Sequence, residues 1–198
     1  MKSRKKMPEA EVSLRLAFYL IKKGLAASDV DVAIDGAQVK TSRTIHFAIA
    51  EFLRGNGWRK KKGAEDIWQG VYFHNSHKHK IRIHSMPGKG DVVTKLETGR
   101  TLRAECKKGP LVRSKSSQEY PLLREALGQL LTIESIDDDD LLAVAVPKSH
   151  KFDELAKRWR KAPLISRFGI CLLTVDENNQ VSGFPNNKIA EPRYAPDP

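Results

Sequence analysis

The stretch DVVTKLETGRTLRAECKK, residues 91–108, decides the fold, because it holds two strand-like segments joined by a turn. Side chains alternate across a strand, so the second segment, residues 101–108, divides into two faces. One face carries Leu102, Ala104 and Cys106, and the other carries Arg103, Glu105 and Lys107. The pattern indicates a strand with a small apolar core face and a polar face on which a carboxylate lies beside an ammonium group.

The turn between the two segments determines where Asp91 points. A two-residue turn at Thr98-Gly99 would place Asp91 opposite Cys106 and away from Glu105, because opposed residues of an antiparallel pair share a face. An odd-length connection, or a bulge near residue 90, would place Asp91 beside Glu105 instead. Gly99 suits the left-handed position of a three-residue loop. We therefore predict an irregular hairpin that brings Asp91 and Glu105 together.

Two carboxylates on one face suggest a metal site. Mg²⁺ prefers oxygen ligands, and Mn²⁺ is a common substitute in such sites. A bound ion of this kind polarises a phosphoryl oxygen and acidifies a bound water. Lys107 would orient that water or stabilise charge on the phosphate.

The rest of the chain predicts alternating helices and strands. We expect helices at residues 9–24, 43–54, 120–134 and 151–161, and strands at 67–73, 79–85, 91–96, 101–108, 141–147 and 165–175. The run 141–147 is continuously apolar, as in a buried strand. Asp35-Gly36 lies between alternating residues and is typical of a hairpin turn.

Asp91 followed by Glu105-Cys106-Lys107 resembles the PD-(D/E)XK nuclease superfamily, which includes restriction endonucleases, Holliday-junction resolvases and repair nucleases. The literal Pro-Asp pair is absent, because Pro87 stands four residues before the aspartate. The family core consists of a helix, a three-strand meander, a second helix and another strand, an order that we place at residues 43–147. The resemblance implies a restriction-endonuclease-like α/β fold, with a mixed central sheet flanked by helices and, here, an N-terminal helical extension.

Further site residues follow from that resemblance. The carbonyl of Cys106 and an acidic residue in the preceding helix would join Asp91 and Glu105 as metal ligands. We assign the acid to Glu51, with a solvated carboxylate as the alternative reading and Glu11 as a weaker substitute. Gln129 would join Asp91, Glu105 and Lys107 as a catalytic residue, or else it caps the edge of the core.

The chain has 198 residues and a formal net charge of +11, which favours a polyanionic partner such as DNA, with RNA left open. The basic residues that we assign to nucleic acid are Lys60, Lys61, Lys62, Lys89, Lys108, Arg113 and Lys115. Cutting both strands of a duplex needs two sites, so a homodimer is compatible with this function.

Length and composition predict one domain at residues 9–190 with a core of about 43–175, between a flexible basic arm at 1–8 and a disordered tail at 191–198. Two cysteines make no disulfide framework, which argues for reduced thiols. The sequence shows neither a signal peptide nor a transmembrane helix, so we expect a cytoplasmic location and no membrane partner.

Other residues of chemical interest have simpler readings. His74, His77, His79 and His84 lack a third metal ligand at recognisable spacing, so contact with phosphate or plain exposure is favoured. The run Asp137–Asp140 reads as a solvated turn. Trp58, Trp68 and Trp159 read as core or rim residues rather than base-stacking platforms.

We therefore expect a Mg²⁺-dependent endodeoxyribonuclease. The alternatives are a nucleic-acid-binding module without catalytic power on a degenerate nuclease fold, and a subunit of a larger complex. The separation of the Asp91 and Glu105 side chains distinguishes these readings, since a nuclease must bring them to one ion.

Overall fold

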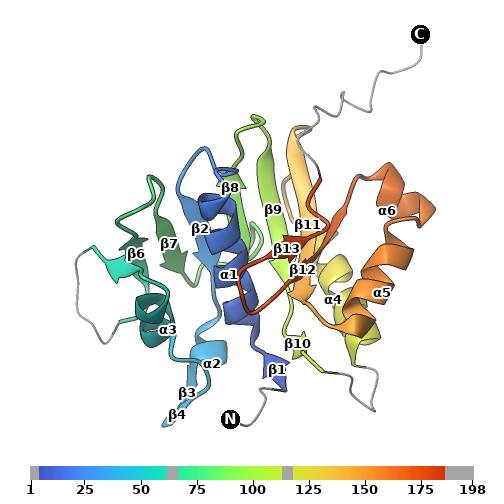
Figure 1. Cartoon of the computed structure of the whole chain (residues 1–198). Coiled ribbons are helices and arrows are strands. Elements are labelled where there is room, and N and C mark those ends of the chain that lie inside the picture. Colours follow the sequence, from blue (N-terminus) through green and yellow to red (C-terminus); the bar gives the residue numbers. More distant parts are fainter. Residues whose placement is uncertain (1–4, 62–66, 113–117, 186–198) are drawn as a thin grey trace.

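The computed structural model describes residues 5–61, 67–112 and 118–185 (Figure 1). Its strands are β1 (Lys6–Met7), β2 (Val30–Ala33), β3 (Lys40–Thr41), β4 (Thr44–Ile45), β5 (Arg59–Lys60), β6 (Gly70–Phe73), β7 (Ile81–His84), β8 (Val92–Lys95), β9 (Thr101–Cys106), β10 (Gly109–Pro110), β11 (Asp140–Pro147), β12 (Cys171–Val175) and β13 (Val181–Ser182). Its helices are α1 (Glu9–Lys22), α2 (Gly36–Val39), α3 (Ile49–Gly55), α4 (Glu119–Leu130), α5 (His150–Trp159) and α6 (Pro163–Arg167).

Within the described ranges, one large sheet has nine strands in the order β13-β12-β11-β9-β8-β2-β7-β6-β5. Strand β9 runs antiparallel to β8 and parallel to β11, which is in turn parallel to β12. Strand β2 runs antiparallel to β8 and parallel to β7. The prediction of an α/β fold with a mixed central sheet flanked by helices is confirmed at this level.

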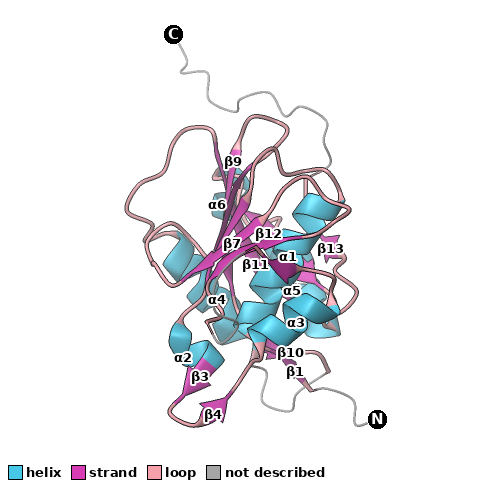
Figure 2. Ribbon diagram, turned by 90° about the vertical axis from the view of Figure 1, so that its left-hand side faces the viewer, coloured by secondary structure: helices cyan, strands magenta, loops and turns pink. Residues whose placement is uncertain are grey.

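Helices cover the two faces of the sheet unequally. Figure 2 shows α1 and α3 on one side of the strands and α4 on the other. On the α1 side, Leu102 and Ala104 belong to a core that includes most of α1. On the other side, Val144 and Val146 of β11 pack with residues of α4 and α5. The sheet between β9 and β12 is therefore buried on both faces.

The N-terminal segment is not an extension. Eleven residues of α1 are buried, among them Leu14, Leu16 and Leu20, which are fully buried. Each such side chain contributes about 1.5–3 kcal/mol to folding. Met7 is also fully buried, in a strand paired with β10. The predicted arm is therefore wrong for residues 5–8, because apolar burial and strand pairing fix them; residues 1–4 and the predicted tail at 191–198 lie outside the described ranges.

Three predicted elements differ from the structure. Asp35-Gly36 is not a hairpin turn, since the Asp35 carboxylate accepts a hydrogen bond from Ala37 N–H at 2.9 Å and caps the short helix α2. The helix expected at 43–54 begins only at residue 49, after the small β3–β4 pair. The strand expected at 165–175 begins at residue 171, because Pro163 starts helix α6.

Two local predictions are confirmed. Along β9, Leu102, Ala104 and Cys106 are buried, while the alternate residues are half-buried. Strand β11 is buried along most of its length, as its apolar run predicts. These strands carry the polar face on which the candidate site lies.

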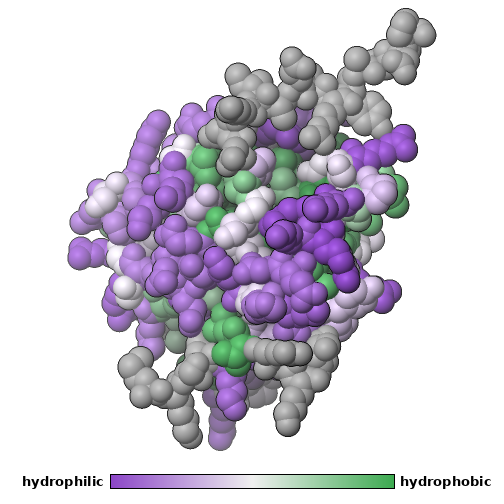
Figure 3. All heavy atoms as spheres, turned by 45° about the vertical axis from the view of Figure 1, so that its right-hand side comes forward, coloured by the Kyte–Doolittle hydropathy of each residue, from purple (hydrophilic) through white to green (hydrophobic). Residues whose placement is uncertain are grey.

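The surface over α4, α5 and α6 is mainly hydrophilic. In Figure 3 the hydrophobic areas of this side are small and separated by hydrophilic side chains. Extensive apolar patches mark stable docking faces, and the possible homodimer stays a prediction. Among the described helices, none is both long enough and apolar enough to cross a bilayer.

Candidate active site

The β8–β9 hairpin has the irregular connection that the sequence predicts. Val92 pairs with Ala104 and Lys95 with Thr101. Leu96 N–H donates to the Arg100 carbonyl at 2.8 Å, which leaves a loop of three residues, 97–99. Gly99 has a φ of 84°, in the left-handed region. Extending the register by one residue sets Asp91 opposite Glu105, on the same face of the sheet.

Asp91 is fixed from three sides. Its N–H donates to the Ala104 carbonyl at 2.9 Å, and its own carbonyl accepts from Ala33 N–H at 2.8 Å. Its carboxylate Oδ2 accepts from Cys106 N–H at 2.8 Å. Gly90 precedes it with a φ of 100°, and a Cβ there would lie 3.3 Å from the Ala104 carbonyl oxygen. Glycine at this position therefore lets β8 begin close against β9 and directs Asp91 towards the end of β9.

Glu105 and Lys107 share the polar face, as the alternation predicts. Lys107 Nζ lies 3.7 Å from Glu105 Oε1. The Lys107 side chain is only 6% exposed, so its charge needs partners within the protein. Its Nζ also lies 3.5 Å from Glu9 Oε1 and 3.7 Å from Glu125 Oε1. Three carboxylates from three different elements therefore surround one buried ammonium group.

Glu9 is a functional candidate that the sequence patterns did not single out. It lies in the first turn of α1, where the helix dipole favours a negative charge. Gln38 Nε2 donates to Glu9 Oε1 at 2.7 Å, and Lys108 N–H donates to Oε2 at 3.4 Å. A carboxylate directly after Pro8, at the start of a helix, is a signal that the sequence does contain.

Glu9, Asp91, Glu105 and Lys107 together form what we call the acidic cluster. The pKa values of two of its acids, Asp91 and Glu105, are raised. Burial raises the pKa of Asp91 to about 6, against the opposing effects of the Cys106 N–H and Lys107. Burial and the neighbouring Asp91 raise the pKa of Glu105 to about 7. Burial acts to lower the pKa of Lys107, but Glu9, Glu105 and Asp91 outweigh it and raise that pKa. Negative charge therefore exceeds what one ammonium group neutralises, and a cation would relieve the excess.

The donor set suits a hard divalent ion. Asp91 and Glu105 offer carboxylate oxygens, which Mg²⁺ and Mn²⁺ prefer. Cys106 N–H points towards Asp91, and the N–H and C=O of one strand residue point the same way, so the Cys106 carbonyl faces the same side. Glu9 adds a third carboxylate. These groups fit the metal that the resemblance implies.

The ligand atoms of the acidic cluster are not all within 4.8 Å of one another, so its side chains would have to move closer to bind one ion. Among the described residues, the one group of three acidic side chains with ligand atoms within 4.8 Å of one another is Asp137, Asp139 and Asp140. Arg103 Nε lies 2.6 Å from Asp140 Oδ2 and neutralises one of these three carboxylates. Asp140 is buried, so the solvated-turn reading holds for Asp137 and Asp139 but is wrong for Asp140. A group of acidic side chains alone is not evidence of a site, and we assign none there.

Two predicted helix residues lie elsewhere. Glu51 is exposed on α3, whose buried residues are Ile49 and Leu53, and among the described contacts it has none with the cluster. Glu11 is fully buried and pairs with Arg15 at 2.7 Å. The helix acid at the cluster is therefore Glu9, because α1, and not α3, begins beside the end of β9.

Gln129 is exposed near the end of α4 and does not reach the cluster. Glu125, one turn earlier, takes that place through its contact with Lys107. Four residues of helix advance about 6 Å, so residue 129 lies one turn away from the position at which Glu125 contacts Lys107. The predicted catalytic role of Gln129 has no geometric support.

The predicted DNA-binding residues divide into three sets. Lys61, Lys89 and Lys108 are exposed. Lys60 is half-buried, with its Nζ donating to the Ile67 carbonyl at 2.5 Å. Lys62, Arg113 and Lys115 lie outside the described residues.

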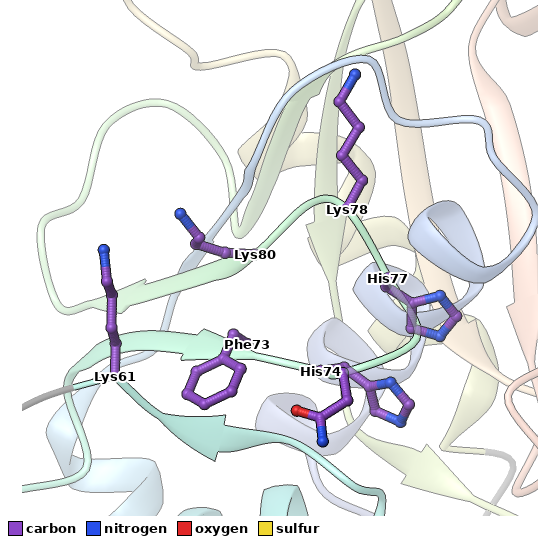
Figure 4. Close-up of a pocket in the computed structure, with 7 residues that line it drawn as sticks. Lys61, Phe73, His74, His77, Lys78 and Lys80 are labelled. Carbon is purple, nitrogen blue, oxygen red and sulfur yellow. The ribbon is translucent and has the colours of Figure 1, made fainter.

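The four histidines at residues 74–84 are half-buried and not plainly exposed, and their contact with phosphate stays a prediction. The His74 and His77 ring centroids are 4.6 Å apart, and both rings lie against buried Trp58. His74 and His77 also line a hollow of about 380 Å³ with Lys61, Phe73 and Lys80 (Figure 4). This hollow lies on β6 and β7 and contains none of the four cluster residues.

No family model matches the chain, and no curated protein or solved structure is significantly similar to it.

Proposed function

We propose that the chain is a metal-dependent nuclease that hydrolyses phosphodiester bonds in DNA, with Glu9, Asp91, Glu105 and Lys107 as its active site. The observation that carries this proposal is the opposition of Asp91 and Glu105 on adjacent strands beside the buried Lys107 ammonium group. Two carboxylates and a lysine on one polar strand face are the group that the PD-(D/E)XK resemblance requires.

The order of the elements supports the same proposal. A helix, three antiparallel strands, a second helix and a parallel strand follow one another as α1, β2, β8, β9, α4 and β11. This is the order of the family core, with residues 34–90 as an insertion between its first two strands. The core then begins at Glu9, and not near residue 43.

Each residue has a defined role in this proposal. Asp91, Glu105, Glu9 and the Cys106 carbonyl would hold Mg²⁺ or Mn²⁺. The bound ion would supply Lewis acidity towards a phosphoryl oxygen and lower the pKa of a coordinated water. Lys107 donates hydrogen bonds from Nζ, first to the carboxylates and then to the attacking water or a phosphate oxygen.

One observation favours a second candidate, a nucleic-acid-binding module without catalytic power. Lys107 contacts Glu9, Glu105 and Glu125, so an internal cation already neutralises part of the acidic cluster. In such a module the cluster would serve stability alone.

Incubation with DNA distinguishes the two candidates. Supercoiled plasmid and branched DNA are incubated with the protein, in Mg²⁺ or in EDTA. The nuclease reading predicts nicked or linear product in Mg²⁺ only. DNA binding without any cleavage in Mg²⁺ or Mn²⁺ would favour the binding module.

A further inference from the structure

Among the described residues, no helix covers one face of strands β8, β2, β7, β6 and β5. On β2, β6, β7 and β8, every second residue is buried in the core on the α1 side, whereas the residues between them are half-buried or exposed. The strand registers place these other residues on the same side as Glu105 and α4. We call this side of strands β8, β2, β7, β6 and β5 the open face; its members are Asp29, Asp31, Ala33, Arg59, Lys61, Val71, Phe73, Lys80, Arg82, His84, Val93 and Lys95.

The candidate active site lies where the open face meets the covered part of the sheet. Asp91 and Glu105 are on the same side of the sheet as the open face. Helix α4 covers this side over β9 and β11, and its Glu125 reaches Lys107. Helix α4 therefore lies on one side of the candidate active site, and the open face lies on the other. A polymer bound at the site can extend over the open face.

The open face is positively charged. It carries five cations, Arg59, Lys61, Lys80, Arg82 and Lys95, against two carboxylates, Asp29 and Asp31. Asp31 is paired with Arg82 at 2.7 Å, and Asp29 accepts a hydrogen bond from the Lys80 N–H at 2.9 Å. The open face therefore keeps an excess of three positive charges, which is the sign expected of a surface that follows a phosphate backbone.

The far end of the open face is hollowed. Figure 4 shows Lys61, Lys78 and Lys80 extending in the same direction from this hollow, with Lys61 and Lys80 beside each other. Its lining residues are lysine, histidine, asparagine and phenylalanine, without an acid. Several ammonium groups on one side of a hollow without a carboxylate suit a phosphate backbone.

We propose that a DNA duplex lies across the open face, with its backbone running from the candidate active site to Lys61 and Lys80. This inference rests on the proposed nuclease function and adds where the substrate extends. Five strand spacings of about 4.8 Å separate β9 from β5, so the contact spans about 24 Å. At about 3.4 Å per base pair, the protein covers about seven base pairs to one side of the cut.

The test measures DNA binding without cleavage. Binding of a fluorescent 20-base-pair duplex is measured by anisotropy in EDTA over a range of salt concentrations. The open-face variant is Lys61→Ala/Lys80→Ala. The matched control is Lys157→Ala/Lys161→Ala, which removes the same charge from exposed lysines on and just after α5. Circular dichroism confirms that both variants are folded.

The open-face variant should bind about tenfold more weakly, with a salt dependence shallower by about two charges, and the control should bind like the unmodified protein. The inference would be overturned if both variants lost the same DNA affinity, or if the open-face variant lost none. So would an unmodified protein that does not bind the duplex. A protein that binds through the open face but never cleaves DNA would refute the nuclease proposal alone.

Discussion

Glu9 Oε1 and Lys107 Nζ lie 3.5 Å apart, although 98 positions separate the two residues in the sequence. The contact joins the first turn of α1 to the end of β9 and completes the acidic cluster. It means that the N-terminal helix supplies part of the proposed active site.

Replacement of Glu9 tests this assignment. Glu9→Gln keeps the shape but removes a charge from the proposed metal site, so we expect metal-dependent cleavage to fall about 10–100-fold. Glu51→Gln, on the exposed side of α3, is the matched control and should cleave normally. The measurement is the initial rate of plasmid nicking at several Mg²⁺ concentrations. A larger loss in the Glu51 variant would restore the sequence-based assignment.

The raised carboxyl pKa values predict a pH dependence of stability. The pKa of Glu105 is about 7 in the folded chain against an ordinary 4.5, so the folded state binds more protons than the unfolded state between these values. Stability should therefore fall as pH rises from about 4.5 to 7 and level off above that range. Glu105→Gln lacks this loss and should be about 1–2 kcal/mol more stable than the unmodified protein at pH 8, after allowance for solvent screening. Urea unfolding at pH 4, 6 and 8 measures the difference; curves that stay parallel for the two proteins would contradict the prediction.

Removal of the Lys107 ammonium group should destabilise the protein, whereas removal of the Glu105 charge should stabilise it. Lys107→Met leaves Glu9, Glu105 and Asp91 without their cation, so we expect a destabilisation of about 1–3 kcal/mol at pH 8. The loss should shrink at pH 5, where the carboxyl groups take up protons. Lys89→Met, in an exposed loop, is the control and should match the unmodified protein in urea unfolding at both pH values. An equal loss at pH 5 and pH 8 would show that packing, and not charge, is what Lys107 supplies.

Two glycines test the local backbone, one in the hairpin and one in a helix. Gly99 has a φ of 84°, so Gly99→Ala should destabilise the protein by about 1 kcal/mol. Gly128 lies inside α4, where an added Cβ atom would meet open space, so Gly128→Ala should stabilise the protein by up to about 1 kcal/mol. Thermal unfolding of both variants gives the two signs. Stabilisation by Gly99→Ala would argue against the three-residue loop that directs Asp91 towards Glu105.

Local patterns made the hairpin predictable. The alternation along β9 depends on a period of two residues, and the loop depends on the conformational freedom of Gly99, so both can be read from consecutive residues. The position of Glu9 depends instead on how α1 packs over β9, which no local pattern encodes. Asp35 shows a related limit, since an Asp-Gly pair serves as a helix cap as readily as a hairpin turn.

Residues 34–90 separate β2 from β8, although the two strands are neighbours in the sheet. The sequence order alone therefore suggests Glu51, on the helix that most closely precedes β8, whereas the helix acid that contacts Lys107 is Glu9 of α1. Gln129 lies one turn of α4 beyond Glu125, which makes the contact with Lys107.

The assignment of Asp91 and Lys107 to the active site is tested by the rate of DNA cleavage in Mg²⁺ by Asp91→Ala and Lys107→Ala, each compared with the unmodified protein. We expect Mg²⁺-dependent cleavage by the unmodified protein and a loss of at least about a hundredfold in both variants, with both still folded. Cleavage at an unchanged rate in both variants would show that Asp91 and Lys107 are not the active site.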